Sequence, residues 1–311
     1  MIDLDAIRAA RQRIQPHIRQ TPLVQAAPVR QAFPGAPDLY LKLENMQIIG
    51  SFKARGAVNK LLSLPAEQVA RGIITASGGN HGLGVAYAGW LANAPARIYL
   101  PHSTPESKAQ KLINWGAQVT YEGDVWDDAN YAALAHAERD GLTYFHPFAD
   151  PAVIVGQGTV GLEVLDALPQ IESIVIAIGG GGLISGISSA IKALKPEVRI
   201  IGVEATGAPT LYESLKAGHL IELAEIRTVA GTLAPRRSEQ INLDIIQRYV
   251  DEIILVSDDD MRAAARWLWF EMGIAAELSG AAALAAVLTG QVQSNGAMCV
   301  LVCGAGTDGL A

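Results

Sequence analysis

The order of strand-like and helical segments is the feature that most constrains this chain. Short apolar segments typical of strands alternate with longer segments of helical periodicity. Such alternation is typical of α/β proteins, in which crossover helices join parallel strands. We expect strands at residues 39–44, 72–75, 97–100, 117–121, 143–145, 174–178, 199–203, 252–256 and 298–303. We expect helices at residues 3–18, 82–92, 105–116, 125–140, 158–168, 182–195, 209–217, 258–272 and 279–288.

The length and composition limit the class of protein. A chain of 311 residues is long enough for two α/β domains with substantial cores. The net charge of -7 disfavours nucleic acid or an anionic membrane surface as the main partner. No segment approaches the roughly 20 uncharged apolar residues of a membrane helix, and the charged first residues do not resemble a secretory signal. We therefore expect a cytoplasmic protein.

Two cysteines lie on the last expected strand. Four steps of about 3.3 Å separate Cys299 from Cys303 by about 13 Å, too far for a disulfide. We expect both thiols to be reduced. Cys303 stands at the end of the strand, where open α/β folds place ligands, although a lone strand cysteine is usually a small core residue.

One lysine lies in an unusual setting. Lys53 follows an aromatic residue in Gly50-Ser51-Phe52-Lys53-Ala54-Arg55-Gly56-Ala57, and the two flanking glycines allow close backbone approach. Taken alone, a lysine belongs on a solvated surface. The alternative is a Schiff-base lysine held against a carbonyl cofactor.

Two glycine-rich segments each follow an expected strand and open a helix. In Ser77-Gly78-Gly79-Asn80-His81-Gly82, free N–H groups and the serine suit a carboxylate, but a plain turn with Asn80 in a left-handed conformation is an alternative. The four glycines Gly179–Gly182 expose donors that suit a phosphate, and close strand–helix packing is the alternative there. Neither segment is a dinucleotide fingerprint or a P-loop, which argues against a nicotinamide dehydrogenase. Together with Lys53 and Cys303, the two segments supply the four groups that pyridoxal phosphate needs.

The chain resembles the fold-type II pyridoxal-phosphate enzymes of the threonine/serine dehydratase and serine racemase family. The shared segments, in family order from about residue 20 onward, are Glu44-Asn45, Gly50–Ala57, Gly79–Gly82, His146-Pro147-Phe148, Gly156-Gln157-Gly158-Thr159, Gly179–Gly182, Glu277–Ala282 and Cys303-Gly304. His81 favours the dehydratase branch, because the sulfhydrylase and threonine synthase branches usually carry Thr there. The resemblance implies two three-layer α/β domains around mostly parallel sheets, as in the tryptophan synthase beta chain. Residues 1–72 and 147–311 would form a large cofactor-binding domain, and residues 73–146 a small, mobile domain on the substrate side.

The resemblance also implies roles for individual residues. Lys53 would carry the cofactor and, with Ser77, form the catalytic pair. The cofactor would contact Phe52, Lys53, Asn80, Gly179, Gly180, Gly181, Gly182, Leu183 and Cys303. The substrate would contact Ser77, Gly78, Asn80 and His81. A thiol at the pyridine nitrogen cannot hold a pyridinium as a carboxylate does, which favours elimination over transamination.

Three positions depart from the family pattern. Gly78 replaces the serine that racemases place opposite the lysine, so racemisation should be weak. Ala230-Gly231-Thr232 replaces Ala-Asp-Gly in the substrate loop, which leaves the pocket for the substrate side chain undefined. Glu204 and the Ala208 carbonyl match the metal site of relatives, but Thr210 replaces an acid, which weighs against a tightly bound divalent cation.

We therefore expect an ammonia-lyase that converts L-threonine or L-serine to a 2-oxo acid and ammonia. The alternatives are serine racemisation, β-replacement, or elimination from a 3-hydroxyaspartate-type substrate on the same cofactor. A non-catalytic sensor of the same fold is a further alternative, although it would not need Lys53. We also expect a homodimer or larger homo-oligomer that binds neither nucleic acid nor membrane.

Overall fold

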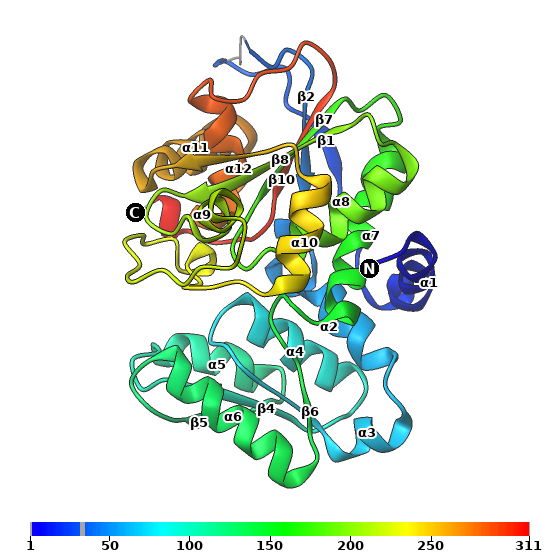
Figure 1. The fold of residues 1–311 in the computed structure, drawn as a ribbon, viewed down its shortest axis with the longest axis vertical. Helices are drawn as coiled ribbons and strands as arrows, with labels where there is room; N and C mark the ends of the chain where they lie inside the picture. Colours follow the sequence, from blue (N-terminus) through cyan, green and yellow to red (C-terminus); the bar gives the residue numbers. More distant parts are fainter. Residues whose placement is uncertain (1, 32–34, 311) are drawn as a thin grey trace.

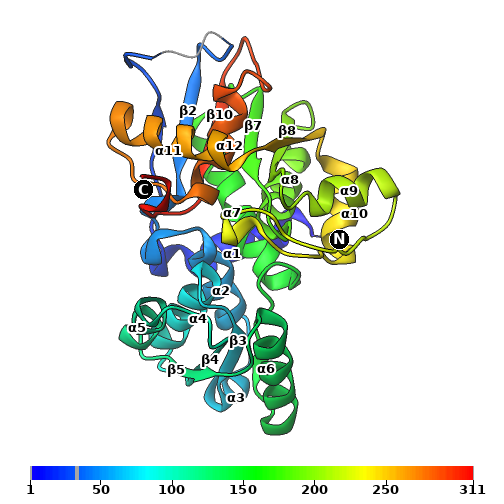
Figure 2. The same cartoon turned by 90° about the vertical axis from the view of Figure 1, so that its left-hand side faces the viewer.

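The computed structural model describes residues 2–31 and 35–310 and contains two sheets, each flanked by helices in a lobe of its own (Figures 1 and 2). The larger sheet has the strand order β1-β2-β10-β7-β8-β9, and the smaller one has the order β5-β4-β3-β6. Within the described residues, β1 alone pairs antiparallel, with β2, and all other paired strands are parallel. The predicted α/β class with two mostly parallel sheets is confirmed.

The elements have the following bounds. The larger sheet consists of β1 Leu23–Gln25, β2 Leu39–Leu43, β7 Ser173–Ala177, β8 Arg199–Ala205, β9 Glu252–Val256 and β10 Met298–Val302. The smaller sheet consists of β3 Ile73–Ala76, β4 Ala96–Leu100, β5 Gln118–Tyr121 and β6 Thr143–Tyr144. The α-helices are α1 Leu4–Ile14, α2 Lys53–Leu62, α3 Ala66–Arg71, α4 Asn80–Leu91, α5 Glu106–Asn114, α6 Trp126–Asp140, α7 Pro151–Ala167, α8 Gly182–Leu194, α9 Thr210–Ala217, α10 Gln240–Tyr249, α11 Asp258–Met272 and α12 Leu278–Leu288. Short 3-10 turns are η1 Gln15–His17, η2 Glu44–Met46, η3 Ile48–Gly50, η4 Gly231–Leu233 and η5 Asp308–Leu310.

The central strands β7 and β10 of the larger sheet are fully buried and, apart from Ser173, apolar. Every residue of β7 and β10 is buried, because helices cover both faces of the sheet. Strand β10 lies between β2 and β7, so the last strand in the chain occupies the middle of the sheet. Since β7 and β10 are parallel, the loops after Ala177 and Val302 leave the same edge of the sheet.

Helix α7 begins earlier than the sequence predicts. We expected its start at Gly158, but the helix begins at Pro151, where the carboxylate of Asp150 accepts hydrogen bonds from two backbone N–H groups of the first turn. The glycines that indicated a non-helical segment serve packing instead. A β-carbon on Gly156 would lie 2.7 Å from the carbonyl oxygen of Arg55, so this glycine lets α7 approach α2 closely.

Helices α2, α3 and α10 were not predicted at all. Helix α2 begins at Lys53 itself and buries Ala54, Ala57, Val58 and Leu61 in the core beneath the smaller sheet. Figure 1 shows α2 where the two lobes meet. This packing joins α2 to the smaller sheet, whereas the predicted boundary assigned residues 1–72 to the large domain. The division into residues 1–72 with 147–311, and 73–146, stays a prediction.

The sequence predicted neither a membrane-spanning helix nor a disulfide between the two cysteines. Every helix within residues 2–31 and 35–310 is too short or too polar to cross a membrane. Cys299 and Cys303 are both free and buried, as the strand spacing predicted.

Candidate active site

The lysine segment is attached to the loop that follows the last strand. Ser51 forms an isolated antiparallel bridge with Gly304, and the N–H of Phe52 donates to the carbonyl oxygen of Cys303 at 3.4 Å. Helix α2 starts at the next residue, so Lys53 occupies its first position. The sequence separates these two segments widely, but the fold joins them into one unit around Lys53.

The amine of Lys53 lies in a polar but poorly solvated position. Its Nζ donates to the carbonyl oxygen of Pro147 at 2.7 Å and lies 5.2 Å from the centre of the Phe52 ring. Desolvation lowers the pKa of Lys53 to about 8, although the charge of Glu277 acts in the opposite direction. A lowered pKa gives the amine a larger neutral fraction near neutral pH, as a nucleophilic lysine requires.

The four-glycine loop between β7 and α8 forms an anion cradle. In the described part of the chain, the N–H groups of Gly179, Gly180 and Gly181 donate to no acceptor. They precede the free N-terminus of α8, which begins at Gly182 and also attracts negative charge. Leu183, the second helical residue, packs its side chain into the larger core, so only its backbone is available to a ligand.

Packing also requires glycine in this loop. A β-carbon on Gly180 would lie 2.2 Å from the ring of Phe148, and Gly181 has a φ of 93°, in the left-handed region. The carbonyl of Gly180 accepts hydrogen bonds from Ser238 Oγ and Asn242 Nδ2, both at 2.9 Å. Because the Gly180 carbonyl is fixed in this way, the N–H groups of the loop stay free to donate to a ligand.

The loop between β3 and α4 ends in a helical asparagine. Asn80 is the first residue of α4 and has no left-handed conformation, so the alternative of a plain turn around Asn80 is wrong. Ser77 Oγ accepts a hydrogen bond from the N–H of Gly79 at 3.3 Å. The amide of Asn80 donates to Glu277 Oε1 at 2.7 Å. The loop therefore reaches across to the larger sheet's lobe through Asn80.

Glu277 is a site residue to which sequence reasoning gave no role. It lies just before α12 and accepts hydrogen bonds from Asn80 and, at 3.4 Å, from Thr232 Oγ1. Burial raises the pKa of Glu277 to about 7, and the charge of Asp308 adds to this effect. Its charge also raises the pKa of Lys53 and of Cys303, so it lies within electrostatic reach of both. In the sequence, an acidic residue before an apolar helix is typical of an ordinary helix start. The position of Glu277 therefore gave no indication of a role in the site.

Cys303 follows β10 and faces the start of α12. Its Sγ donates to the carbonyl oxygen of Ser279 at 3.4 Å. Burial raises the pKa of the thiol well above its ordinary value, and the charge of Glu277 adds to this, so the thiol stays protonated. A protonated thiol supplies a weak, neutral contact at the edge of the site.

His81 has a structural role that differs from the expected contact with substrate. Its side chain is buried, and Nε2 lies 2.9 Å from the carbonyl oxygen of Phe145 and 3.1 Å from Thr75 Oγ1. Burial lowers its pKa well below the ordinary value, so the ring is neutral. The ring fixes the first turn of α4 to the segment after β6, and its contact with the substrate stays a prediction.

Gly78 faces the smaller lobe. A β-carbon at this position would lie 3.0 Å from Thr104 Cγ2 and 3.4 Å from Leu100 Cδ2. The backbone of Gly78 is outside the positive-φ region, so no conformational rule reserves this position for glycine.

The predicted metal ligands have other partners. Both carboxylate oxygens of Glu204 accept backbone N–H groups, from Leu211 at 2.9 Å and Tyr212 at 2.8 Å, in the first turn of α9. Burial raises the pKa of Glu204 to about 8. No group of three or more His, Cys, Asp or Glu side chains suited to a metal occurs in the chain as described. Glu204 and the Ala208 carbonyl stay predicted ligands of a divalent cation, although both Glu204 oxygens already accept backbone N–H groups.

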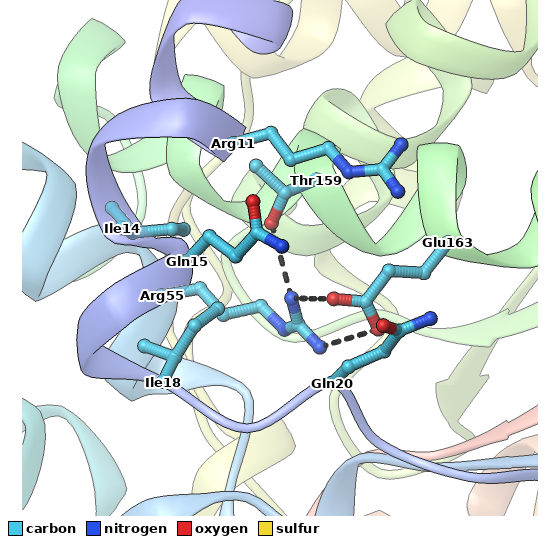
Figure 3. Close-up of a pocket in the computed structure, with 8 residues that line it drawn as sticks. All are labelled: Arg11, Ile14, Gln15, Ile18, Gln20, Arg55, Thr159 and Glu163. Carbon is cyan, nitrogen blue, oxygen red and sulfur yellow. Dashed lines mark hydrogen bonds and ion pairs between the residues drawn. The ribbon is translucent and has the colours of Figure 1, made fainter.

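A buried ion network holds the helix that carries Lys53, and Figure 3 shows two of its members, Arg55 and Glu163. Arg55 donates to both oxygens of Glu44 at 2.7 Å, and to Glu163 Oε1 and Oε2 at 2.6 and 2.9 Å. Lys42 donates to Glu163 Oε2 at 2.5 Å. The four charges balance, and they fix α2 to β2 and α7 just beyond the lysine.

These features fit pyridoxal phosphate. The open N–H groups of the glycine loop suit its phosphate, Lys53 suits its aldehyde, and a neutral thiol suits an unprotonated ring nitrogen. When bound, this cofactor withdraws electrons from the α-carbon of an amino acid. Fold and site together define a pyridoxal-phosphate enzyme of fold type II.

The comparisons with known proteins agree with this class. The sequence model of the family described as "Pyridoxal-phosphate dependent enzyme" matches residues 14–304, and the chain belongs to that family. An L-threonine ammonia-lyase of Thermotoga maritima is 40% identical over 288 residues, which cover 93% of this chain and 71% of that protein. The structure of maize serine racemase superposes with a TM-score of 0.92 at 33% identity and covers 97% of this chain and 93% of that one. The processed form of threonine deaminase isoform 2 from Solanum lycopersicum gives 0.91 at 34% identity, covering 97% and 83%.

Proposed function

We propose that this chain is a pyridoxal-phosphate-dependent ammonia-lyase acting on L-threonine or L-serine. The β-hydroxyl leaves as water after the proton at the α-carbon is removed. Hydrolysis of the resulting unsaturated amine then gives a 2-oxo acid and ammonia.

The state of Lys53 carries this proposal. Its amine has a pKa lowered to about 8 and lies at the first position of a helix that a buried ion network holds in place. An amine in this state can hold and release a proton at the substrate's α-carbon near neutral pH. A non-catalytic sensor would have no use for an amine prepared in this way.

The neighbouring residues support orientation and binding. The N–H groups after Ser77 suit the substrate carboxylate, and Ser77 stays our candidate partner of Lys53 in catalysis. Asn80, held by Glu277, would orient the cofactor through its 3-hydroxyl, with Phe52 beside the ring. Cys303 would meet the pyridine nitrogen as a neutral thiol.

Serine racemisation is the second candidate, because the chain is similar to maize serine racemase at a TM-score of 0.92. Gly78 argues against it as the main activity. Racemisation needs a proton donor on the face of the α-carbon opposite Lys53, and glycine offers none. Relatives named L-threonine ammonia-lyase also favour elimination.

The test is an assay of the purified, cofactor-loaded protein against a panel of 3-hydroxy amino acids. Release of 2-oxo acid from L-threonine or L-serine, with little D-amino acid by chiral chromatography, is the expected result. Conversion of L-serine mainly to D-serine would replace the proposal with the racemase, and no turnover of any member would refute both.

We also infer a homodimer or larger homo-oligomer acting in the cytoplasm. Two large apolar side chains on α11, Trp269 and Phe270, are 45% and 74% exposed and offer a contact surface. The two free thiols are consistent with a reducing compartment. Light scattering of the purified protein measures the assembly directly.

A further inference from the structure

One side chain of α6 reaches the last residue of a strand in the smaller sheet. Trp126 opens α6, and its indole Nε1 donates to the carbonyl oxygen of Ala76 at 2.8 Å. Ala76 ends β3 and immediately precedes Ser77. Figure 2 shows α6 beside β3, and Ala129 and Ala133 of the helix share one core cluster with Ala76. Trp126 therefore contacts the strand end from which the Ser77 segment leaves the sheet.

The carbonyl of Ala76 needs this donor because the neighbouring strand supplies none. On the β6 side of β3, the N–H of Phe145 donates to the carbonyl oxygen of Ile74 at 2.8 Å. Because alternate residues face the same neighbouring strand, the next donor in this series would be residue 147, to Ala76. Residue 147 is a proline and has no N–H. Ala76 is fully buried, where an unpaired carbonyl is destabilising, and the indole of Trp126 takes the place of the missing donor.

This exchange of partners also serves the lysine. Pro147 lies beyond the end of β6, and its carbonyl oxygen accepts the Lys53 amine at 2.7 Å. The segment after β6 can thus turn toward Lys53 while Trp126 satisfies the strand end that this segment leaves unpaired.

The start of α6 is itself fixed by contacts other than the indole. Asp128 Oδ2 accepts the N–H groups of Asp124 at 3.0 Å and Val125 at 3.3 Å. Ser103, in the loop after β4, donates from Oγ to the carbonyl oxygen of Asp124 at 3.2 Å. These bonds hold the backbone of Trp126 in place, so its indole can act as a fixed support for the end of β3.

The segment that follows this strand end presents unoccupied donors. Within residues 2–31 and 35–310, the N–H groups of Gly78, Asn80 and His81 donate to no acceptor. Residues 77–79 alone separate β3 from α4, so the end of β3 determines where these donors point. Donors that are held in place before a ligand arrives bind it more tightly, because less conformational freedom is lost on binding.

We propose that Trp126 is a positioning residue for substrate binding: its indole N–H holds the end of β3 so that residues 77–79 and the start of α4 present their N–H groups to the α-carboxylate of the amino acid. This inference rests on the proposed ammonia-lyase function and concerns the carboxylate contact of the same site. In this role Trp126 acts through the backbone of Ala76 and needs no contact of its own with cofactor or substrate.

Two substitutions separate the effect of the N–H group from that of the ring. Trp126→Phe keeps an aromatic ring and removes the donor, whereas Trp126→His keeps a ring N–H at the same number of bonds from the β-carbon. Trp126 is 41% exposed, so both variants should fold. Trp90→Phe is the matched control, because Trp90 of α4 is 60% exposed and its indole donates to no residue that the structure describes.

The main measurement is ligand binding to the holoenzyme, followed by cofactor absorbance. L-alanine has the α-carboxylate but no hydroxyl to eliminate, and ethylamine is the same molecule without the carboxylate. Trp126→Phe should weaken the Kd for L-alanine about 3- to 10-fold, the usual effect of losing one hydrogen bond, and leave the Kd for ethylamine unchanged. Trp126→His should restore most of the affinity, and Trp90→Phe should change neither Kd. With L-serine, Trp126→Phe should raise KM by a similar factor at nearly unchanged kcat.

Three results would overturn the inference. One is an equal loss for L-alanine and ethylamine in Trp126→Phe, which would indicate a general disturbance of the site. Another is an unchanged Kd for both ligands in that variant. The third is a loss in Trp126→His as large as in Trp126→Phe, which would assign the effect to the bulk of the indole. Neither ligand undergoes elimination, so a selective loss for L-alanine would support the inference even if the holoenzyme turned over no substrate and the proposed function failed.

Discussion

At the scale of single residues, the environment of Lys53 determines its chemistry. Desolvation lowers its pKa from 10.5 to about 8, so the amine becomes neutral above about pH 8. A neutral amine attacks an aldehyde, whereas an ammonium does not.

The first prediction follows from this pKa. The rate at which apoprotein takes up pyridoxal phosphate should rise with pH and level off above about pH 8, measured by stopped-flow absorbance. An exposed lysine would continue to gain rate toward its ordinary pKa of 10.5. Lys53→Ala should lose the visible absorbance of bound cofactor and orders of magnitude of turnover, with unchanged circular dichroism. Activity with the absorbance band retained in Lys53→Ala would refute the assignment.

The second prediction concerns Gly78. Its backbone tolerates a side chain, and the nearest obstacle is the methyl of Thr104 at 3.0 Å from the added β-carbon. Gly78→Ser should therefore fold and should raise the fraction of D-amino acid product, because a hydroxyl can act as a general acid, an effect of about 10²–10⁴-fold.

Gly78→Ala controls for the added bulk at this position. Chiral chromatography should find no increase of D-product in that variant. An equal increase in both variants would assign the effect to packing, and substantial D-serine from wild type would contradict the role given to Gly78.

The candidate site residues stood out in the sequence because glycine, lysine and cysteine lie beside expected strands, and their roles stay predictions. Glu277 did not stand out, since its role depends on Asn80, which is distant in sequence and meets it only in the fold. His81 was assigned to the substrate by its motif, but in the structure its ring is buried and contacts the carbonyl oxygen of Phe145. The sequence indicates a candidate residue where the signal is local, and it gives no signal where a tertiary partner decides the role, as at Glu277.

At the scale of elements, hydrophobic runs predicted the strands better than periodicity predicted the helices. Strands β7 and β10 are buried throughout and apolar apart from Ser173, and both were predicted within a residue or two. Helix α7 was predicted too short because its glycines have low helix propensity. In the structure, close packing of α7 against α2 outweighs that propensity. Helix α10 has a detectable signal, since Asn242, Leu243, Ile245 and Ile246 recur on one buried side.

The third prediction tests the attachment of α2. Arg55→Met would leave Glu163 paired with Lys42 and the buried carboxylate of Glu44 with no ion-pair partner, only the Thr21 hydroxyl. Breaking a buried ion pair from one side typically costs about 3–5 kcal/mol, so the urea midpoint should fall markedly. Arg11→Met removes a partly exposed pair with Asp166 and should cost about 1 kcal/mol or less. An equal fall of the urea midpoint in the two variants would show that the buried network stabilises the fold no more than the partly exposed pair does.

At the scale of the whole molecule, the candidate site draws residues from both lobes. Asn80 comes from the smaller sheet's lobe, and Glu277 and the glycine cradle come from the larger one. A ligand that contacts both lobes stabilises their arrangement against unfolding, because it binds the folded state alone.

The fourth prediction is that removal of pyridoxal phosphate lowers the thermal midpoint. A ligand present at 100 times its Kd adds about 2.7 kcal/mol to the free energy of unfolding. Calorimetry of the apoprotein, before and after reloading, measures the shift. Lys53→Ala should show a smaller recovery, and an unchanged midpoint in wild type would mean that the cofactor does not bind across the folded site.

The central position of β10 has a consequence for the order in which the protein can be completed. During synthesis β2 emerges early, β7 emerges midway, and the strand that belongs between them emerges last. Until residues 298–302 leave the ribosome, β2 and β7 have no partner on their facing edges, and the segment around Lys53 lacks the backbone of Cys303 and Gly304. Unpaired edges attract other chains. A message cut short before this strand would therefore yield both an inactive product and one prone to aggregate, so that the same few residues complete the catalytic centre and close the sheet.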